Sequence, residues 1–598
     1  MAKKDVMRFE LLMDAGNGAQ KAGDILIKTL AKSGRYVYIE PLIPAEISPP
    51  KRTPHSLSGA VIRVANRELT NIGSTTDLML AEHEILLNRR LDDCDYSDSC
   101  IILLDMAEER RAKDAYAAVM ERSKDAGLRV IPFSMDEGSL AIIKDLHGNG
   151  KNMYYLGMLG AMYEVPIGDL KLAVQTTFKK LSEDKLAKNI EILKNGYDNA
   201  LSVAPETYEI AATEVASDSI LLDGNMALAL GIIDSGYKLY SGYPITPAST
   251  IMHNLAKLFP SYGGMVHQAE DEISAVGSAI GSYFAGVPAV TGTSGPGLSL
   301  KQEFIGLAYA AEVPLVVIDV QRGGPSTGLP TRTEQTDLFA AVFGAHGDNA
   351  KVVISVANVE DCFYAPHVAR YLAEKLRMPV FILSDYSTSV SYKVLPKLPV
   401  QIVASIDDIN ETVLSRFFLK QLPDDIEMVK TNQSDPGVED KMRRVTGLNT
   451  NEEGFVLYTS SSNHRGHQVR NEKIHHVKRS LIVPDLIGES SGDVLVIGWG
   501  SSRGVIKESI ERLRSDGVNA SGLHFKIVYP LPLGLAEVFS RFKQVVTVEM
   551  AYGDAFKPTP LATLLRSETL VDVKNLISNA TGRPLKPMDV IQKVKLLV

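Results

Sequence analysis

The stretch Ser241–Thr250, SGYPITPAST, marks the point at which a strand gives way to a helix. It follows the β-like run YKLY and precedes the apolar-periodic run IMHNLAKLF. The spacing predicts Thr246 at the N-cap of the helix and Pro247 at its first position. A hydroxyl and unpaired backbone N–H groups at the carboxyl end of a strand could receive a carboxylate, although a well-capped junction without chemistry explains the same residues.

The region around this junction, residues 217–390, repeats the alternation of strand and helix. Its strand candidates are YKLYSGY, GMVHQ, PAVTGT, PLVVIDV, KVVISV and PVFILS. Continuous apolar strands separated by helical runs are typical of a parallel sheet that is buried on both faces. We therefore predict a doubly wound, mainly parallel sheet whose ligands bind at the carboxyl ends of the strands.

Residues 1–204 also alternate short apolar strands with helices, which predicts a further α/β domain with a largely parallel sheet. The turn Gly16-x-Gly18-x-x-x-x-Gly23 does not have the GxGxxG spacing of dinucleotide-binding folds. We interpret it as a tight turn that could approach a phosphate, or as a turn with a structural role alone. A linker is expected at 202–217.

The C-terminal part of the chain divides into two regions. Residues 391–490 are predicted to be an irregular connecting region, with a polar, loop-like stretch at 430–453. Residues 491–598 return to alternating strands and helices. The predicted fold class is thus multidomain α/β, built from doubly wound, mainly parallel sheets.

The composition limits the classes of function. At 598 residues the chain is too long for one hydrophobic core, so several domains are expected. A formal net charge of −9 gives no support for binding nucleic acid or an anionic membrane, and no apolar run is long enough to span a bilayer. The N-terminus has no signal-peptide pattern, so we expect a cytoplasmic protein.

The cysteines exclude one kind of redox centre. The chain has only Cys94, Cys100 and Cys362. They cannot supply the four thiolates of an iron–sulfur cluster, and they form no CxxC pair. Any redox centre that this protein uses must therefore be organic or lie on another chain.

A cluster of carboxylates, Glu270, Asp271 and Glu272, opens a helix whose body, ISAVGSAIGSYFAG, is small and apolar. Carboxylates in a first helical turn complement the helix dipole, and this alone explains most such clusters. A carboxylate pressed against a surface of small residues would, however, be partly desolvated and could hold or share a proton.

Two further loops carry candidate site residues. TGTSGPG, which contains Ser294 and Gly295, offers backbone N–H donors but lacks the lysine of a P-loop. Arg322 follows a buried strand and is well placed to bind a carboxylate with two parallel hydrogen bonds. Thr331 and Arg332 are further polar candidates, and a surface salt bridge would explain Arg332 equally well.

The segment 463–480, NHRGHQVRNEKIHHVKRS, is basic and rich in histidine. Its histidines form no convincing zinc-ligand set, and it lacks the wide aromatic-bearing patch typical of nucleic-acid binding. We interpret it as a solvated or subunit-facing segment.

Taken together, GYPITPAST, HQAEDEISAVGSAIGS, TGTSGPGLSL and DVQRGGPSTGLPTRTEQTD resemble the α subunit of 2-oxoacid:ferredoxin oxidoreductases. Residues 1–204 resemble the γ domain of this family, fused in front. Residues 217–390 resemble its pyrimidine-binding domain, and residues 491–598 its transketolase C-terminal-like domain. The fused order is most similar to members that act on 2-oxoglutarate or on a broad range of 2-oxoacids.

The sequence departs from the family pattern in the γ-like domain. The GGQG-like turn that the family usually carries is replaced here by Gly16-Asn17-Gly18-Ala19-Gln20. Family γ domains are associated with coenzyme A, so coenzyme A is expected as a substrate, but this turn is not assigned as its site.

The resemblance implies thiamine diphosphate held between this chain and a β chain, in a heterotetramer. The β chain would supply the Mg²⁺ site and a 4Fe–4S cluster, and this chain would hold no metal. Coenzyme A would accept the acyl group, and ferredoxin would carry the electrons away. The reverse reaction, a reductive carboxylation that fixes CO2, would use the same parts.

The resemblance also implies roles for individual residues. Glu272 matches the glutamate that hydrogen-bonds the aminopyrimidine of the cofactor, a proton-transfer role suited to a desolvated carboxylate. Thr246 and Arg322 match the positions that receive the carboxylate of the 2-oxoacid. Further candidates near the cofactor or substrate are Tyr243, Pro244, Ile245, Ser294, Gly295, Thr331 and Arg332.

The sequence leaves the substrate open. We expect 2-oxoglutarate, whose distal carboxylate needs a second cation, which Arg332 or the β chain would provide. Pyruvate or a broad range of 2-oxoacids is the alternative within the same class. From another class, the chain could be a non-catalytic assembly subunit that keeps the fold, but such a subunit would have no need of both Glu272 and Arg322.

Overall fold

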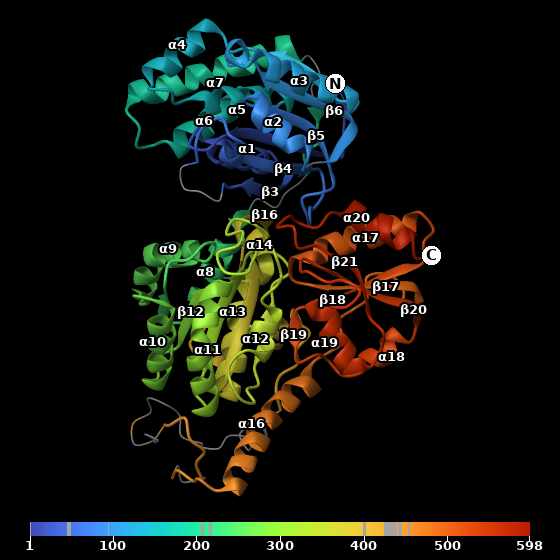
Figure 1. Cartoon of the computed structure of the whole chain (residues 1–598). Coiled ribbons are helices and arrows are strands. Elements are labelled where there is room, and N and C mark those ends of the chain that lie inside the picture. Colours follow the sequence, from blue (N-terminus) through green and yellow to red (C-terminus); the bar gives the residue numbers. More distant parts are fainter. Residues whose placement is uncertain are drawn as a thin grey trace. The chain divides into compact units, whose positions relative to one another are not determined.

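The structure is a computed structural model that describes residues 2–44, 49–93, 95–204, 208–213, 218–398, 402–423, 439, 445–451 and 455–598. It comprises two compact units (Figure 1). The N-terminal unit consists of Met1–Leu222 and Ser391–Lys397, and the C-terminal unit of Asp223–Val390 and Leu398–Val598. Cys94 and most of the predicted loop 430–453 lie outside the described residues.

The N-terminal unit is built on an eight-stranded sheet of order β7-β6-β5-β2-β4-β3-β16-β9. Its strands are β2 (Val6–Asp14), β3 (Tyr36–Leu42), β4 (Leu57–Ala65), β5 (Thr75–Ala81), β6 (Asp95–Asp105), β7 (Arg129–Phe133), β9 (Ile220–Asp223) and β16 (Tyr392–Leu395). A separate pair joins β1 (Ala2–Lys3) to β8 (Tyr208–Glu209).

This sheet is mixed, which corrects the prediction that it is largely parallel. Strands β2, β5, β6 and β7 run parallel, but β4 is antiparallel to both of its neighbours and β16 is antiparallel to β3. Helix α1 (Ala19–Lys32) makes the crossover from β2 to β3. The connection from β3 to β4 has no α-helix in its described residues, so the chain turns back beside β3.

Helices cover this sheet, and two of them approach very closely. They are α2 (Glu84–Leu91), α3 (Lys113–Asp125), α4 (Glu137–Asp145), α5 (Lys151–Met162), α6 (Ile167–Thr177) and α7 (Glu183–Val203). A Cβ at Gly157 of α5 would lie 2.1 Å from the Leu193 carbonyl oxygen, and one at Gly196 of α7 would lie 2.1 Å from that of Tyr154. Glycine at both positions therefore lets α5 and α7 pack backbone to backbone.

The C-terminal unit contains a seven-stranded sheet of order β11-β10-β12-β13-β15-β14-β19. All the strands predicted in 217–390 are present: β10 (Leu239–Gly242), β11 (Met265–Gln268), β12 (Ala289–Thr293), β13 (Leu315–Gln321), β14 (Val352–Ser355) and β15 (Pro379–Asp385). They are mutually parallel, and only β19 (Ile527–Tyr529), which comes from the last region of the chain, pairs antiparallel. The prediction of a mainly parallel sheet is confirmed here.

The helices of this part of the unit alternate with its strands. They are α8 (Gly224–Asp234), α9 (Ser249–Leu258), α10 (Glu272–Phe284), α11 (Gly295–Ala310), α12 (Leu338–Phe343), α13 (Val359–Leu376) and α14 (Tyr386–Val390). The short α15 (Glu411–Ser415) follows.

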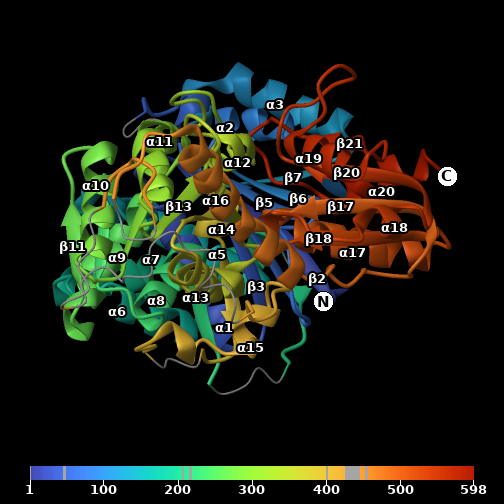
Figure 2. The same cartoon turned by 90° about the horizontal axis from the view of Figure 1, so that it is seen from below.

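The last region forms a second, all-parallel sheet of order β18-β17-β20-β21. Its strands are β17 (Gly492–Trp499), β18 (Ala520–Phe525), β20 (Phe542–Glu549) and β21 (Lys574–Ser578), and its helices are α17 (Arg503–Ser515), α18 (Leu535–Phe539), α19 (Pro560–Thr569) and α20 (Pro587–Lys595). Figure 2 shows these strands side by side in red. The prediction of α/β structure in this region is confirmed.

The histidine-rich segment is a regular helix, α16 (Ser460–Ser480), within the region predicted to be irregular. One face is buried, because Lys473 forms a 2.7 Å ion pair with Glu312, the two side chains being 1% exposed. Arg470 also stacks over the Tyr309 ring, 5.4 Å from its centroid. The polar composition hid the helix because its buried face is partly made of cations with dedicated partners. No described helix is long and apolar enough to cross a membrane.

Candidate active site

The candidate site lies at the carboxyl edge of the seven-stranded sheet. Gly242 of β10 pairs with Gly292 of β12, and Thr293 of β12 pairs with Asp319 of β13. Since these parallel strands end together, the loops that follow them meet at one edge. The four motifs that the sequence singled out thus belong to one region of the C-terminal unit.

The turn after β10 differs from the prediction. Helix α9 begins at Ser249 with Ala248 at its N-cap, so Thr246 is not the cap and Pro247 is not the first helical residue. The helix starts late because the turn carbonyls have other partners. The Pro247 carbonyl accepts a 3.0 Å hydrogen bond from Asn225 Nδ2, and the Thr246 carbonyl accepts a 2.7 Å bond from Arg322.

The other residues predicted in this turn stay accessible. Tyr243 is exposed, Pro244 and Ile245 are half-buried, and Thr246 is exposed. Thr246 therefore contributes its backbone carbonyl to Arg322 while its hydroxyl remains available to a ligand.

Glu272 is the first residue of α10 and only 6% exposed. Asp271 caps the helix by accepting a 2.7 Å hydrogen bond from the Ser274 N–H. The Glu272 carboxylate itself makes no hydrogen bond to another described residue. Glu272 is thus a buried carboxyl group whose hydrogen-bonding capacity remains for a ligand.

Gly297 of α11 provides the surface against which the Glu272 side chain lies. A Cβ at Gly297 would lie 2.7 Å from Glu272 Cγ and 2.8 Å from Oε1. The desolvation predicted for the carboxylate therefore comes from α11 rather than from the small residues of α10. On that small-residue face, Gly281 is exposed, and a Cβ there would meet nothing within 4 Å.

Ser294 and Gly295 form the start of α11. Ser294 occupies the N-cap, and its buried hydroxyl has no hydrogen-bond partner among the described residues. A Cβ at Gly295 would lie 2.8 Å from both carboxylate oxygens of Asp337. Glycine at this position lets the start of the helix approach the Asp337 carboxyl group.

Arg322 lies beside a pair of buried carboxyl groups that sequence reasoning missed. Asp319 lies two residues before the end of the buried β13, and Asp337 precedes α12. The Asp319 oxygens meet no N–H or O–H donor among the described residues, so a proton shared with Asp337 satisfies both groups. The only signals in the sequence are an aspartate within the apolar run PLVVIDV and another within TEQTD.

Burial governs the ionisation of this cluster. Desolvation, and then the neighbouring Asp337 carboxyl, hold the pKa of Asp319 well above its usual range. Desolvation raises the pKa of Asp337 to about 6. Desolvation also lowers the pKa of Arg322, which the two carboxyl groups partly offset. Arg322 thus stays cationic, while the raised pKa values of Asp319 and Asp337 mean that the pair carries less than two negative charges.

The loop after Arg322 folds back on itself and brings Thr331 and Arg332 to the same edge. Gly323 N–H donates to the Arg332 carbonyl at 3.1 Å, and Leu329 N–H donates to the Gly323 carbonyl at 2.8 Å. Thr331 is 8% exposed. The Arg332 guanidinium donates to the Thr331 carbonyl at 3.0 Å.

Gln335 anchors the end of this loop to the four-stranded sheet of the same unit. Its backbone N–H donates to the Met550 carbonyl at 2.7 Å, and its side-chain amide donates to the Trp499 carbonyl at 2.9 Å. The amide oxygen accepts from the Met550 N–H at 3.2 Å. These bonds hold the loop that carries Arg322, Thr331 and Arg332 between two sheets.

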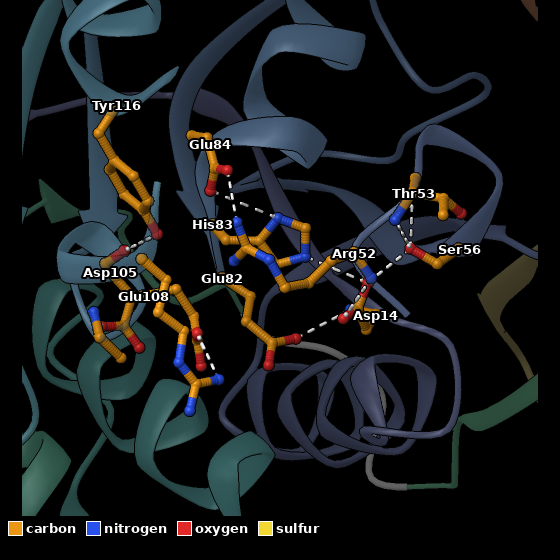
Figure 3. A network of polar contacts seen from close by, with 12 residues as sticks. Asp14, Arg52, Thr53, Ser56, Glu82, His83, Glu84, Asp105, Glu108 and Tyr116 are labelled. Carbon is orange, nitrogen blue, oxygen red and sulfur yellow. Dashed lines mark hydrogen bonds and ion pairs between the residues drawn. The ribbon is translucent and has the colours of Figure 1, made fainter. Parts of the chain in front are cut away.

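The N-terminal unit has its own polar cluster at the carboxyl ends of strands, which Figure 3 shows from close by. Asp14, at the end of β2, accepts a 2.5 Å bond from Ser56 and lies 3.1 Å from His83 Nε2. Arg52 pairs with Glu84 at 2.5 Å. The charged groups of this cluster thus pair with one another, although Arg52 Nη1, His83 Nδ1 and Glu84 Oε2 are buried without a hydrogen-bond partner among the described residues.

The glycine turn lies beside this cluster. Gly16 and Gly18 have φ values of 86° and 87°, so the prediction of a tight turn is confirmed. Asn17, between them, donates to Glu82 at 2.8 Å and accepts from Lys51 at 3.1 Å. Nothing in this geometry assigns a ligand to the turn. Among the described residues, no group of three or more His, Cys, Asp and Glu could hold a metal ion.

Comparison with known proteins assigns the parts of the chain to family models. Residues 231–461 match the model described as pyruvate flavodoxin/ferredoxin oxidoreductase, thiamine diP-bdg. Residues 14–199 match pyruvate ferredoxin/flavodoxin oxidoreductase, and residues 492–590 match pyruvate:ferredoxin oxidoreductase core domain II.

Relatives match over most of the chain. The 2-oxoglutarate oxidoreductase subunit KorA of Mycobacterium tuberculosis is 32% identical, over 94% of this chain and 87% of its own length. The 2-oxoglutarate synthase subunit KorA of Methanothermobacter marburgensis is 34% identical, over 57% of this chain and 90% of its own. A solved 2-oxoglutarate:ferredoxin oxidoreductase from Magnetococcus marinus, with 2-oxoglutarate, coenzyme A and succinyl-CoA bound, is 28% identical with a TM-score of 0.84, over 99% of this chain and 100% of that chain.

The fold and the family models define an α/β protein with a thiamine diphosphate-binding domain, in which a buried carboxyl group and an arginine share one sheet edge. The chain belongs to the 2-oxoacid:ferredoxin oxidoreductases, a family of oxidoreductases.

Proposed function

We propose that this chain is the α subunit of a 2-oxoglutarate:ferredoxin oxidoreductase. In the reaction, 2-oxoglutarate and coenzyme A give succinyl-CoA and CO2, and ferredoxin takes up the electrons; the reverse reaction fixes CO2. The relatives from Mycobacterium tuberculosis and Magnetococcus marinus, which both carry 2-oxoglutarate in their names, support this substrate. Pyruvate or a broad range of 2-oxoacids is the alternative within the family.

The observation that carries the proposal is the state of Glu272. It is a buried carboxyl group with no hydrogen bond to another described residue, at the same sheet edge as Arg322. A buried polar group normally has a partner, so this carboxyl group fits a ligand that brings one. An aminopyrimidine ring offers a nitrogen with which the carboxyl group can share a proton.

The residues around Glu272 fit thiamine diphosphate. When bound, the cofactor would supply a nucleophilic carbon for the 2-oxo group and an electron sink for decarboxylation. Glu272 would hold or release a proton at the pyrimidine nitrogen. Tyr243, Pro244, Ile245, Ser294 and Gly295 would line the site, and the orphaned Ser294 hydroxyl there needs a partner from a ligand.

Arg322 would bind and orient the substrate. Its Nη1 is engaged by the Thr246 carbonyl, while its Nε is buried without a hydrogen-bond partner among the described residues. The remaining N–H groups suit the C1 carboxylate of a 2-oxoacid. The hydroxyls of Thr246 and Thr331 would complete that contact, and Arg332 would face the distal carboxylate of 2-oxoglutarate.

The remaining parts of the reaction are assigned to other molecules. Mg²⁺ and a 4Fe–4S cluster would lie on a β subunit, because this chain has only three cysteines. Ferredoxin would receive electrons from that cluster, and coenzyme A would accept the acyl group. A cytoplasmic heterotetramer is the assembly that we propose.

The proposal is tested on the chain co-expressed with its β subunit. Supplied with coenzyme A, an electron acceptor and equal amounts of 2-oxoglutarate and pyruvate, the complex should form succinyl-CoA, detected by mass spectrometry. Acetyl-CoA in equal yield would make it a broad-range enzyme. Neither product, with thiamine diphosphate bound and the cluster intact, would favour the non-catalytic assembly subunit. The chain purified alone should be colourless and inactive.

A further inference from the structure

Lys301 is a fully buried lysine directly behind Glu272. It lies on α11, and its side chain is 0% exposed. Its Nζ donates a 2.9 Å hydrogen bond to the backbone carbonyl of Glu272 and a 3.2 Å bond to the Thr291 hydroxyl. The ammonium group therefore joins the first turn of α10 to strand β12.

One face of α11 contacts Glu272 at two levels. Gly297, one turn before Lys301, lies against the Glu272 side chain, and Lys301 binds its backbone carbonyl. Residues four apart lie on the same face of a helix. Helix α11 thus leaves room for the Glu272 side chain at Gly297 and anchors the Glu272 backbone through Lys301.

A buried ammonium group lowers the stability of the fold unless hydrogen bonds and opposite charges compensate for its lost hydration. The charged groups that act on Lys301 are Glu272 and Asp271, both at the start of α10. Neither carboxylate forms a salt bridge with Lys301 among the described contacts, and its two hydrogen-bond partners are neutral oxygens. Desolvation lowers the pKa of Lys301 to about 8, although the two carboxylates oppose this shift.

Lys351 of the same unit shows what a structural buried lysine looks like. It is also 0% exposed, and desolvation lowers its pKa to about 8. Its Nζ donates to the carbonyls of Val342, Gly344 and Asn349, at 3.3, 2.6 and 3.1 Å. The ammonium group of Lys351 thus has three carbonyl partners around the end of α12. The shorter of the two hydrogen bonds of Lys301 instead goes to the backbone carbonyl of Glu272.

We propose that Lys301 is a positioning residue for Glu272, which holds the first turn of α10 in place and keeps a positive charge beside the Glu272 carboxyl group. In a site of low dielectric, a buried ammonium group and nearby carboxylates act on one another more strongly than they would in water. The inference rests on the proposed function, because it concerns the proton that Glu272 exchanges with an aminopyrimidine ring.

The test uses the co-expressed complex with Lys301→Met, Lys301→Gln and Lys301→Arg, and with Lys351→Met as the matched control. Lys301→Gln keeps a hydrogen-bond donor without the charge, and Lys301→Arg keeps the charge. The first readout is the rate of hydrogen–deuterium exchange at the thiazolium C2 of bound thiamine diphosphate. The second is the pH profile of kcat, together with KM for the 2-oxoacid.

We expect Lys301→Met and Lys301→Gln to slow both C2 exchange and kcat on the order of 10²-fold, with KM changed little. Wild-type activity should fall above about pH 8, where Lys301 loses its proton, and this fall should be absent from both uncharged variants. Lys301→Arg should restore exchange and move the fall to higher pH. Lys351→Met should lower Tm without changing either readout.

The inference would be overturned if Lys301→Gln had the same rate of C2 exchange and the same kcat as the wild type. The inference would also be overturned if Lys351→Met, at an equal drop in Tm, lost as much exchange and kcat as Lys301→Met. The exchange measurement needs no 2-oxoacid, so it separates the two proposals. A wild-type complex that exchanges C2 hydrogen without turning over any 2-oxoacid contradicts the proposed function and leaves the role of Lys301 measurable.

Discussion

Arg322 donates a 2.7 Å hydrogen bond from Nη1 to the backbone carbonyl of Thr246, so the loop after β13 is joined to the turn before α9. This bond orders two elements that are 76 residues apart in the chain. It also explains why the helix starts at Ser249, since the Thr246 carbonyl is already engaged. The geometry of the turn and the proposed contact with the substrate thus depend on the same guanidinium group.

Substitution of Glu272 tests the proton-transfer role. Glu272→Gln keeps the size and hydrogen-bonding shape of the side chain but cannot exchange a proton, so we expect 2-oxoacid-dependent viologen reduction to be abolished. Glu270→Gln, at an exposed carboxylate two residues earlier, is the matched control and should remain active. Gel filtration checks that both variants assemble. Near-normal turnover by Glu272→Gln would remove Glu272 from the chemistry.

Substitution of Arg322 tests the carboxylate contact. Arg322→Ala should raise KM and lower kcat/KM on the order of 10²-fold or more, since a charged contact with the substrate is lost. Arg322→Lys should recover only part of this, because an ammonium group cannot form two parallel bonds. Steady-state kinetics at saturating coenzyme A measure both. An unchanged KM in Arg322→Ala would place the substrate elsewhere.

Gly297 tests the fit around Glu272. In Gly297→Ala the new methyl group would lie 2.0 Å from Thr293 Oγ1 and 2.7 Å from Glu272 Cγ, so the carboxyl group must move. We expect kcat to fall at least 10-fold, as misplaced catalytic groups typically cause losses of about this order or more. Gly281→Ala on α10 is the control, because its Cβ meets nothing within 4 Å. Equal activities of the two variants would contradict this geometry.

The buried pair Asp319 and Asp337 predicts a pH-dependent stability. The pKa of Asp337 is raised from 3.8 to about 6, so the folded state binds its proton more tightly than the unfolded state does. The stability that this group contributes is fully present below about pH 4 and is lost as the pH rises through about 6. At neutral pH the ionised Asp337 therefore destabilises the fold, by up to about 3 kcal/mol for a shift of this size.

Asp337→Asn removes this titration. The Tm of the variant minus that of the wild type should become more positive between pH 5 and pH 8. Asp348→Asn, at an exposed aspartate in the same unit, should show a flat difference over this range. A flat difference for Asp337→Asn as well would mean that its carboxyl group is not protonated in the folded protein at pH 5.

Much of the fold followed from local pattern. The six parallel strands of the seven-stranded sheet were each located from the sequence, and all of them except β11 are buried along their whole length. The loops that bear Glu272, Ser294 and Arg322 were located too, because parallel strands expose their carboxyl ends at one edge. Signals of this kind need only residue type and spacing.

The failures share a cause, which is contact between distant residues. Thr246 is a residue type typical of an N-cap, but Arg322 and Asn225 form hydrogen bonds to the carbonyls of Thr246 and Pro247, and the helix begins later. Asp319 lies in an otherwise apolar strand and acquires meaning only beside Asp337. Lys301 is one of several polar residues in α11, and only its contact with Glu272 distinguishes it from the others. Helix α16 was hidden because Lys473, which its polarity suggested was exposed, is buried against Glu312.

The most direct measurement of the central claim is coenzyme A-dependent viologen reduction by the co-expressed complex, with 2-oxoglutarate and pyruvate assayed in parallel. The account predicts rapid reduction with 2-oxoglutarate, far slower reduction with pyruvate, and none with either when Glu272→Gln replaces the wild-type chain. No reduction by the wild-type complex with any 2-oxoacid, with thiamine diphosphate and the cluster in place, would contradict it.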